Sequence, residues 1–478
     1  MGGNARPRFL FITRGTAMND HNDVLKNLPS VDELLRSPAL AGAAAQHGHE
    51  SLADAARCSV QAARDKLRAG VSVDTGSDAL AAHALALLED RARPSLQPAI
   101  NATGILLHTG LGRAVLPETA VAHAHEVIAG YSTLAIEAET GLRGSRDSHV
   151  RGLLAELTGA EDGTVVNNNA AATMLILNTL ARGREVIVSR GQLVEIGGSF
   201  RMPDVMASSG AVMREVGTTN KTHLRDYEAA INECTGAILR VHQSNYRIVG
   251  FTDEPSIEEL AGLACQYNLP LIDDLGSGAL VDLARFGLER EPLVRDSVAA
   301  GAEVICFSGD KLIGGPQSGI IVGKSAHIKA IRKNQLMRAF RVGKFTIAAL
   351  EATLRLFRDP DKLTTTHPFY RMLAQPLEEL ARRAQAVATR VACIGDVRVE
   401  DEAAQVGSGS VPAQSMPTKV LAIRPSSVTA TELAKRLRLH RPPVFARISK
   451  DAVLLDFRTI QPGEDEIVAK AVAEAMKQ

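Results

Sequence analysis

A lysine follows directly on an apolar segment that has the composition of a buried strand. Residues Val304–Phe307 run into Ser308–Lys311 (Ser-Gly-Asp-Lys), and a glycine-rich turn comes next. A lysine that projects from a strand end into a cleft is partly desolvated, which lowers its pKa and suits a Schiff base with an aldehyde cofactor. Ser308 is placed to hydrogen-bond a phosphate of that cofactor. Taken alone, Lys311 would more often be an ordinary surface lysine after a strand.

A carboxylate ends a second apolar segment, 37 positions before the lysine. The segment Leu271–Asp274 reads as a buried parallel strand, in which Asp273 and Asp274 point to opposite faces. A buried carboxylate needs a cationic partner, and the protonated ring nitrogen of pyridoxal phosphate is one. We therefore expect Asp274 to bind that nitrogen. The alternative is an aspartate that caps a turn through its side chain.

Three asparagines separate a third strand-like segment from an alanine-rich helix start. Small residues at a helix N-terminus expose backbone N–H groups that can cradle a phosphate, so we expect Asn168, Asn169 and Ala170 to bind one. Simple capping by asparagine would give the same pattern. The sequence has neither a P-loop pattern nor a GxGxxG pattern after a strand, which disfavours nucleotide binding. The three motifs together follow the chain order of aspartate-aminotransferase-like pyridoxal phosphate enzymes.

Strands and helices must alternate after Pro98 to position these residues. Helices are expected at Ala170–Leu180, Leu224–Ile231, Ile257–Tyr267 and Ala348–Phe357, and strands at Gly163–Val166, Glu185–Ser189, Ala211–Val216, Ala237–His242, Pro270–Asp274, Val304–Ser308 and Gly319–Val322. Such alternation predicts an α/β domain of three layers, with a mostly parallel sheet covered by helices. In such sheets ligands bind beyond the carboxyl ends of the strands.

Smaller regions flank this domain. Ser30, with Glu33 three residues later, predicts a helix start, and the helical period of apolar residues continues to about residue 93. We expect an extension at 1–27, an N-terminal helical domain at 28–97, a catalytic domain at 98–360 and a small α+β domain at 361–478. In the last of these, strands are expected at Lys419–Ile423, Val444–Ile448 and Ala452–Phe457. A loop is expected at Val406–Thr418.

The composition excludes several classes of protein. Of 478 residues, 45% are hydrophobic and 23% charged, with 54 basic and 54 acidic side chains, which excludes a disordered polymer and a surface that coats nucleic acid indiscriminately. We expect no membrane span, because no apolar run approaches about 18 residues. Five scattered cysteines without a CxxC pair predict a reduced, cytoplasmic setting and no metal site. A start at Met18 would leave residues 1–17 as an unstructured extension.

The sequence also resembles a known family, the bacterial selenocysteine synthases or L-seryl-tRNA(Sec) selenium transferases. The resemblance runs from about Leu28 to the C-terminus and rests on these segments: Ile100–Gly104, His108–Arg113, Arg143–Asp147, Asn167–Ala172, Ser189–Gly198, Val216–Asn220, Val241–Tyr246, Asp274–Gly278 and Ser308–Gly315.

The resemblance implies that seryl-tRNA(Sec) loses its serine hydroxyl on pyridoxal 5'-phosphate and gains selenium from selenophosphate. Lys311 would hold the cofactor and shuttle the α-proton, with Asp310 beside it in the catalytic set. The arginines that the family places around the selenium donor fit Arg113, Arg338 and Arg341, because an arginine fork binds a phosphate-like dianion in a planar, bidentate way. The spacing of the last two predicts one helix face.

The resemblance further implies a homo-oligomer, a ring of dimers that forms a decamer, with a tRNA-binding N-terminal domain and Asn245 among the cofactor-binding residues. Two departures stand out. The family commonly has Glu at Gln192, near the ring, and Ser189–Val194 holds no aromatic residue to stack on that ring, so Leu193 or another aliphatic side chain is expected there.

Two alternatives stay open. One is a lyase of the same cofactor class that acts on a free, phosphorylated amino compound, although such relatives tend to lack the N-terminal helical domain. The other is a non-catalytic RNA-binding scaffold on a degenerate transferase fold. A scaffold has no reason to keep Asp274, Ser308 and Lys311 together, which favours the enzyme.

Overall fold

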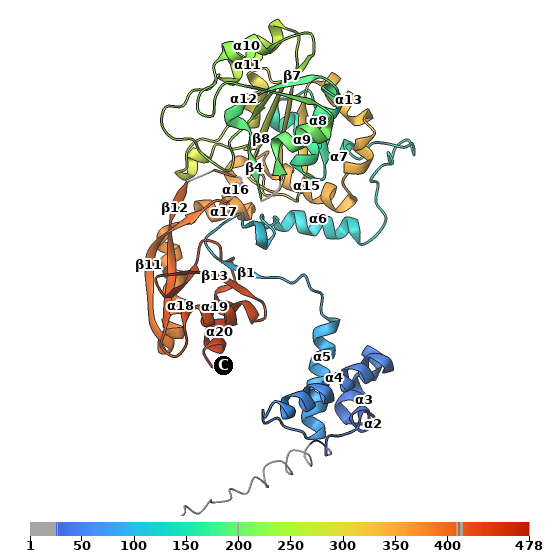
Figure 1. Cartoon of the computed structure of the whole chain (residues 1–478), viewed down its shortest axis with the longest axis vertical. Helices are drawn as coiled ribbons and strands as arrows, with labels where there is room; N and C mark the ends of the chain where they lie inside the picture. Colours follow the sequence, from blue (N-terminus) through green and yellow to red (C-terminus); the bar gives the residue numbers. More distant parts are fainter. Residues whose placement is uncertain (1–24, 26, 198–199, 408–409, 412–413, 478) are drawn as a thin grey trace, which may run out of the picture. The chain divides into compact units, whose positions relative to one another are not determined.

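The computed structural model describes residues 25, 27–197, 200–407, 410–411 and 414–477 (Figure 1). The chain divides into two compact units, Met1–Pro98 and Ala99–Gln478. Most of the predicted extension at 1–27 lies outside the described residues.

The first unit is a small bundle of helices. Its helices are α2 (Val31–Leu35), α3 (Pro38–His47), α4 (His49–Arg68) and α5 (Ser77–Ala92). The predicted cap is present, because the Ser30 hydroxyl accepts a hydrogen bond from the Glu33 N–H at 3.2 Å. Apolar side chains such as Leu34, Leu52 and Leu80 are buried together, so this unit has a hydrophobic core of its own.

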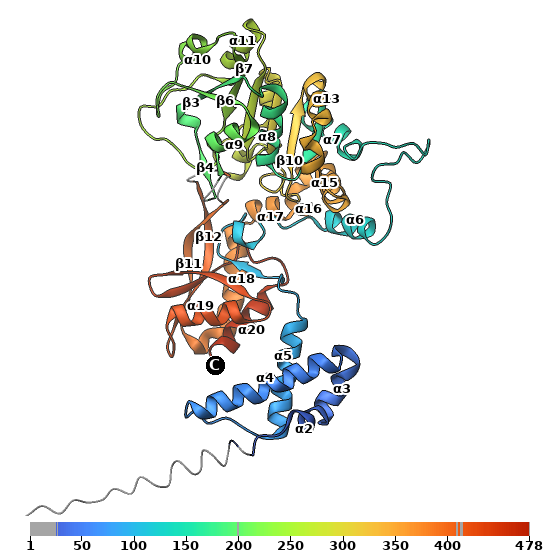
Figure 2. The same cartoon turned by 45° about the vertical axis from the view of Figure 1, so that its right-hand side comes forward.

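A seven-stranded sheet forms the centre of the second unit (Figure 2). In spatial order its strands are β2 (Asp162–Val166), β10 (Gly319–Gly323), β9 (Val304–Ser308), β8 (Leu271–Gly276), β7 (Thr235–Val241), β3 (Glu185–Ser189) and β6 (Val212–Val216). All seven predicted strands are present. The sheet is parallel except for β10, which runs antiparallel to both of its neighbours.

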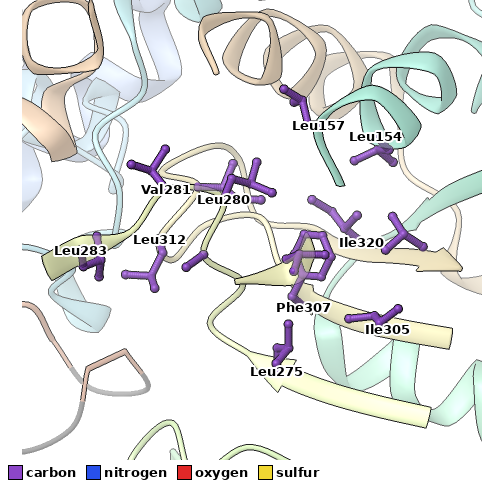
Figure 3. Packing of buried hydrophobic residues seen from close by; sticks show 14 of the residues in the cluster. Leu154, Leu157, Leu275, Leu280, Val281, Leu283, Ile305, Phe307, Leu312 and Ile320 are labelled. Carbon is purple, nitrogen blue, oxygen red and sulfur yellow. The ribbon is translucent and has the colours of Figure 1, made fainter. Parts of the chain in front are cut away.

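Both faces of this sheet are buried, which makes the predicted three layers. Along β9, Ile305 and Phe307 point into one core and Cys306 into another, because successive side chains of a strand alternate between faces. Figure 3 shows the first core, where Phe307 and Ile320 lie among leucines. The covering helices include α7 (Ser148–Thr158), α8 (Asn169–Leu180), α9 (Met202–Ser209), α10 (Leu224–Ala230), α11 (Ile257–Gln266), α12 (Val294–Ala299), α13 (Ser325–Lys333) and α15 (Lys344–Leu356).

A five-stranded sheet lies nearer the C-terminus. Its order is β1 (Ile100–Ala102), β13 (Val444–Ser449), β14 (Ala452–Asp456), β12 (Ser415–Pro425) and β11 (Gly395–Gln405). Helices α18 (Leu377–Val391) and α19 (Ala430–Leu439) pack on it, and α20 (Asp465–Ala475) packs on these two helices. The loop predicted at Val406–Thr418 is shorter than expected, because Ser415–Thr418 already pairs with β11. Strand β11 itself was not predicted.

The segment that follows β1 also pairs with residues far away in the sequence. Strand β1 runs parallel to β13. The N–H groups of Leu106 and Leu107 then donate to the carbonyls of Gln405 and Val406, at 2.9 and 2.8 Å. The chain leading to Arg113 is therefore tied to the end of β11.

The remaining elements are shorter or lie outside the two sheets. They are α6 (Glu118–Ile128), α14 (Leu336–Phe340), α16 (Leu363–Thr366), α17 (Pro368–Ala374), β4 (Glu195–Ile196), β5 (Phe200–Arg201) and the 3-10 turns η1 (Thr109–Leu111), η2 (Arg190–Gln192), η3 (Leu283–Phe286), η4 (Pro360–Lys362) and η5 (Ala392–Ile394). Within the described ranges, no helix has both the length and the apolar composition needed to cross a membrane.

Candidate active site

A cavity of about 320 Å³ opens beyond the carboxyl ends of β8 and β9. Its lining includes eight of the residues predicted from the sequence, namely Arg113, Asn168, Asn169, Ala170, Asp274, Ser308, Asp310 and Lys311. They come from the end of β8, the end of β9, the start of α8 and the loop after η1. This position is the one expected for a ligand site in a parallel α/β sheet, and the volume suits a small organic molecule.

Lys311 is buried where the turn after β9 faces this cavity, with 5% of its surface exposed. Burial first, and then the nearby Arg113 guanidinium, lower the pKa of its amine, which stands at about 8 instead of 10.5. Asp310 and Asp274 act in the opposite direction because their negative charges favour the ammonium form. With this pKa roughly a tenth of the amine is neutral at pH 7, far more than for an exposed lysine, and the neutral form is a nucleophile and a proton acceptor.

Asp274 lies near the end of β8 and is held by three hydrogen bonds. Its Oδ1 accepts from Asn169 Nδ2 at 2.8 Å and from the Gly276 N–H at 3.0 Å, and its Oδ2 accepts from the Thr173 hydroxyl at 2.7 Å. Burial raises the pKa of Asp274, while these hydrogen bonds and Lys311 favour the ionised form. A cation placed against this carboxylate from the cavity would offset its burial.

Asp273 points away from the cavity, as the strand alternation predicts. Its carboxylate binds Arg240 at 2.9 Å and the Ser297 hydroxyl at 2.6 Å, and it is fully buried. The two neighbouring aspartates therefore do different work. Asp273 fastens β8 to β7 and α12, and Asp274 faces the cavity.

The N-terminus of α8 faces the same cavity. Asn168 is the N-cap, and its side-chain oxygen accepts from the Ala171 N–H at 2.9 Å, so the capping alternative is present in the structure. The cap still leaves the first backbone N–H groups of this helix, which is 12 residues long, turned toward the cavity. The partial positive charge of a helix N-terminus favours binding of an anion there. The Asn169 side chain binds Asp274 instead, so only its backbone is available to a phosphate.

Arg113 reaches the cavity from a strained loop. Its backbone has φ of 61°, a region that a residue with a Cβ rarely adopts, and its N–H donates to the His108 carbonyl at 2.9 Å. The guanidinium lies 3.6 Å from the Asp310 carboxylate. Strain of this kind is tolerated where the position of a side chain matters for function.

Arg338 and Arg341 line a different cavity, of about 380 Å³. There they meet Arg143 and Arg146, which the sequence placed in a family motif without a role. Burial lowers the pKa of Arg146, and the charges of Arg341, Arg143 and Arg338 lower it further. A cluster of mutually repelling guanidiniums is an arrangement that binds an anion.

The prediction of one helix face for the arginine pair is wrong. Helix α14 ends at Phe340, and Arg341 has extended backbone because it forms a bridge with Val166 at the end of β2. The Asn167 N–H donates to the Phe340 carbonyl at 2.9 Å, which fixes this edge one residue before the α8 cap. The two guanidiniums reach one cavity from a helix and from the segment after it.

Three other predicted contacts fall outside the lining of the Lys311 cavity. Asn245 donates to the Glu195 carbonyl at 2.9 Å, and its buried Oδ1 has no partner among the described residues. Gln192 joins the ends of two strands by accepting from the Val241 N–H at 3.0 Å and donating to Glu254 at 3.3 Å. Leu193 is not part of the lining either.

The walls of the Lys311 cavity come from residues that the sequence analysis did not single out. Val194, Ile196, Phe200 and Met202 supply apolar surface, and His242 supplies a polar wall. Thr173, which holds Asp274, was missed as well. It lies four positions after Asn169 and thus on the same face of α8, a spacing that could have identified it.

The chemistry of this cavity fits pyridoxal phosphate. A buried carboxylate suits the ring nitrogen, a neutral lysine suits the aldehyde, and a helix N-terminus with Ser308 suits the phosphate. Gly276 has a φ of 64°, a conformation that favours glycine, and a Cβ added there would lie 2.9 Å from Ser244 Oγ and 4.0 Å from Lys311 Nζ. The lack of a side chain at Gly276 therefore leaves room beside the lysine amine. The buried Asn169 Oδ1 is also unpartnered among the described residues.

Comparison with known proteins covers most of the chain. A model of the L-seryl-tRNA selenium transferase family matches residues 99–461, and a model of the selenocysteine synthase N-terminal region matches residues 25–64. The L-seryl-tRNA(Sec) selenium transferase of Methylocella silvestris is 49% identical over 442 residues, which cover 91% of this chain and 94% of that protein. The enzyme of the same name from Solidesulfovibrio magneticus is 49% identical over 464 residues, 95% and 98% of the two chains.

A solved structure of D-glucosaminate-6-phosphate ammonia-lyase has the same fold. It superposes with a TM-score of 0.55 at 21% identity and covers 80% of this chain and 96% of that one. The predicted fold class is confirmed: the chain has the aminotransferase-like α/β fold of pyridoxal phosphate enzymes of fold type I, with an N-terminal helical region and a C-terminal α+β sheet.

Proposed function

The chain belongs to the family of L-seryl-tRNA(Sec) selenium transferases, and we propose that the Lys311 cavity is where it performs the reaction of that family. The enzyme converts seryl-tRNA(Sec) to selenocysteinyl-tRNA(Sec). The observation that carries the assignment of the site is the meeting of Lys311, Asp274 and the start of α8 in one cavity.

Pyridoxal 5'-phosphate is the proposed cofactor. When bound, it supplies an electron sink that allows the α-proton and then the β-hydroxyl of the serine to leave. Lys311 Nζ is the proposed point of attachment, and the Asp274 carboxylate would accept a hydrogen bond from the ring nitrogen. Ser308 and the first N–H groups of α8 would hold the phosphate. Val194, Ile196 and Phe200 would exclude water from the ring.

Lys311 is also the proposed proton carrier. Its pKa of about 8 lets the amine accept a proton at neutral pH and return it in a later step. Asp310 and Asp274 stabilise the ammonium form that results. Arg113 opposes that form, so the amine is balanced between its two states.

Arg113, Arg338 and Arg341 are the proposed ligands of the selenium donor, which we take to be selenophosphate. Arg113 lies in the Lys311 cavity beside Asp310, and the other two lie with Arg143 and Arg146 in the second cavity. The repulsion within that cluster supports binding of a dianion, which guanidiniums bind in a bidentate way.

We propose that the enzyme is a homo-oligomer, and specifically a decamer. The support is that Arg338 and Arg341 do not line the cavity of Lys311 in the same chain. A second copy of the chain would supply Arg338 and Arg341, which the Lys311 cavity lacks, from its own arginine cavity. Light scattering on the purified protein tests this, and a stable monomer with full activity would contradict it.

The first unit is the proposed binding site for tRNA(Sec), and the cytoplasm is the proposed location, since aminoacylated tRNA is found there. The unit has its own hydrophobic core, and the described lining of the Lys311 cavity comes from the second unit. The proposal therefore assigns the chemistry and the recognition of RNA to different units.

Incubation with seryl-tRNA(Sec), pyridoxal phosphate and selenophosphate tests the whole proposal. We expect selenocysteine esterified to the tRNA, identified by mass spectrometry after hydrolysis. Borohydride reduction of the protein with its cofactor should label Lys311 and no other lysine. Lys311→Ala should lose both the label and the product, with Lys333→Ala, an exposed lysine at the end of α13, as the control. Labelling of a different lysine would disprove the site.

A further inference from the structure

Two buried polar side chains bind the turn directly after Lys311. The Tyr370 hydroxyl donates to the Leu312 carbonyl at 2.9 Å, and His367 Nε2 bonds to the Ile313 carbonyl at 2.9 Å. Both side chains are fully buried. They lie on α17 and at its N-cap, about 55 positions beyond the lysine, where the prediction placed no site residue.

The hydrogen bonds of His367 fix its tautomer. Its Nδ1 accepts from the Phe369 N–H at 3.3 Å, so Nε2 carries the proton and donates to Ile313. Burial lowers the pKa of His367 to about 4, which keeps the ring neutral in that tautomer at neutral pH. Burial also raises the pKa of Tyr370, so its hydroxyl remains a donor.

The turn is pressed against these side chains. Gly314 has φ of 65°, its N–H donates to the Lys311 carbonyl at 2.9 Å, and an added Cβ would lie 2.3 Å from His367 Cε1. Leu312 is buried in the same core cluster as Tyr370, and Figure 3 shows it near Leu283. The backbone from Lys311 to Gly314 is thus held by hydrogen bonds to its carbonyls and by packing of its side chains.

Packing alone does not explain a histidine and a tyrosine at these positions. Phe286, Phe357 and Phe369 surround them, with ring centroids 5.1 to 5.9 Å apart. A polar group among aromatic rings costs stability unless it is hydrogen-bonded, and phenylalanine or leucine would fill the same space without that cost. Here the bonds that offset the cost go to the two carbonyls that follow Lys311.

We propose that His367 and Tyr370 are positioning residues that, by holding the Leu312 and Ile313 carbonyls, fix where Lys311 enters the cavity. The inference rests on the proposed role of Lys311 in holding the cofactor. It adds that α17, at the start of the C-terminal region, controls the reactivity of a lysine on the central sheet.

The expected consequence concerns both the place and the protonation of the amine. Arg113, Asp310, Asp274 and His242 are the charged or titratable groups that surround Lys311 in its cavity. Their effect and that of burial depend on the lysine staying where it is. A loosened turn lets water reach Nζ, which moves its pKa back toward the value of an exposed lysine and reduces the fraction of time spent in the reactive position.

The test compares four variants by labelling Lys311 with pyridoxal phosphate and borohydride across a pH range, with peptide mapping as the readout. Tyr370→Phe and His367→Leu should move the midpoint of labelling upward by about half a pH unit or more and weaken cofactor binding about threefold to tenfold. His367→Gln, whose amide nitrogen can replace Nε2, should restore most of the wild-type midpoint. Phe357→Leu loses ring packing in the same cluster but keeps both hydrogen bonds, so it should keep the wild-type midpoint even if its Tm falls.

The outcomes separate this inference from the proposed function. If wild-type protein is not labelled at Lys311, the proposed site is wrong. If wild-type protein is labelled and Tyr370→Phe keeps its midpoint and affinity, the positioning role is overturned. The same holds if Phe357→Leu shifts the midpoint as much as the polar variants do. Should His367→Leu fail to fold, Tyr370→Phe and His367→Gln still decide the question.

Discussion

At Lys311 the cost of burying an amine is part of how the site works. A shift of the pKa from 10.5 to about 8 corresponds to about 3 kcal/mol in favour of the neutral form. The folded protein therefore binds fewer protons than the unfolded chain between about pH 8 and 10.5. The stability of the cofactor-free protein should rise with pH across that window, and below it the full cost remains.

Lys311→Met should consequently stabilise the cofactor-free protein at pH 7, by on the order of 1–3 kcal/mol. The gain is smaller than the full pKa shift implies, because Asp274 and Asp310 lose their favourable interaction with the positive charge of the lysine. Urea unfolding at several pH values measures it, and the difference from wild type should shrink above pH 8. Lys333→Met, at an exposed position, should show no such pH-dependent gain. A destabilised Lys311→Met protein at pH 7 would contradict this account.

Thr173 should be needed for cofactor affinity, although it is not expected to touch the cofactor. Thr173→Val removes the donor 2.7 Å from Asp274 Oδ2 and leaves a buried carboxylate less well held. We expect about tenfold weaker binding of pyridoxal phosphate, measured by absorbance titration. Thr173→Ser keeps the hydroxyl and should bind within about twofold of wild type. Equal affinities for the valine and serine variants would rule the role out.

The residues proposed for covalent or ionic contacts with the cofactor have the clearest signals in the sequence. Lys311 follows one apolar strand and Asp274 lies near the end of another, and the alternation of side chains was enough to separate Asp274 from Asp273. Thr173 and Tyr370 act through hydrogen bonds to a partner about 101 and 58 positions away in the sequence, and no local pattern reports such a contact. Arg341 was wrongly predicted to lie on a helix. Its extended backbone depends on the bridge with Val166, a distant contact that the local sequence does not show.

Among the elements, the edge of the large sheet is held by an ion-pair cluster. Arg332 on α13 donates to both carboxylate oxygens of Asp162 on β2, at 2.9 and 2.6 Å, and lies 3.4 Å from Asp147. Burial alone would raise the pKa of Asp162, but the hydrogen bonds from Arg332, Arg151 and the Gly163 N–H hold it below its ordinary value. The cluster fixes the strand that leads into α8.

Arg332→Met should therefore destabilise the protein by about 2–4 kcal/mol, since it leaves buried carboxylates without their main partner. Urea unfolding at pH 7 measures the loss. Arg358→Met breaks a comparable bidentate pair with Glu156, but both side chains are about half exposed to solvent, so it should cost clearly less stability than Arg332→Met. Equal losses in the two variants would show that burial of the cluster adds nothing.

Strands that are buried on both faces were predicted almost to the residue, because their apolar runs are continuous. Strand β11 escaped because it is largely exposed and carries several charged residues, so its sequence, GDVRVEDEAAQ, lacks such a run. Local sequence patterns also do not show that β10 runs antiparallel to its neighbours. The sequence GIIVG is the same kind of apolar run in either orientation, and the connection of ten residues between β9 and β10 is shorter than a parallel crossover needs.

On the scale of the whole molecule, the two units should separate the chemistry from the recognition of RNA. A chain that begins at Ala99 keeps every described residue of the Lys311 cavity. We expect it to bind pyridoxal phosphate at Lys311 like the full chain and to lose most of its affinity for tRNA(Sec). Borohydride labelling and filter binding measure the two properties. Unchanged tRNA affinity would place the RNA site elsewhere in the chain.

The family could be recognised from motifs spread over nearly the whole sequence, and the relatives confirm it. The arrangement of the two cavities could not be predicted from the sequence. Motifs give the order of functional residues along the chain, whereas Arg113, in a loop, and Arg338, on α14, reach separate cavities because of chain paths that no motif encodes. The domain boundaries stay predictions.

The pairing of β1 with β13, and of Leu106 and Leu107 with the end of β11, bears on how the enzyme is made. Every residue proposed for the chemistry has been synthesised once Arg341 is added, yet the loop that carries Arg113 has no complete support until Val444–Ala446 follows. A nascent chain interrupted between these points would possess all its reactive groups and still be unfinished. Support for the loop that carries Arg113 therefore waits for residues about 100 positions beyond the last of the proposed site residues.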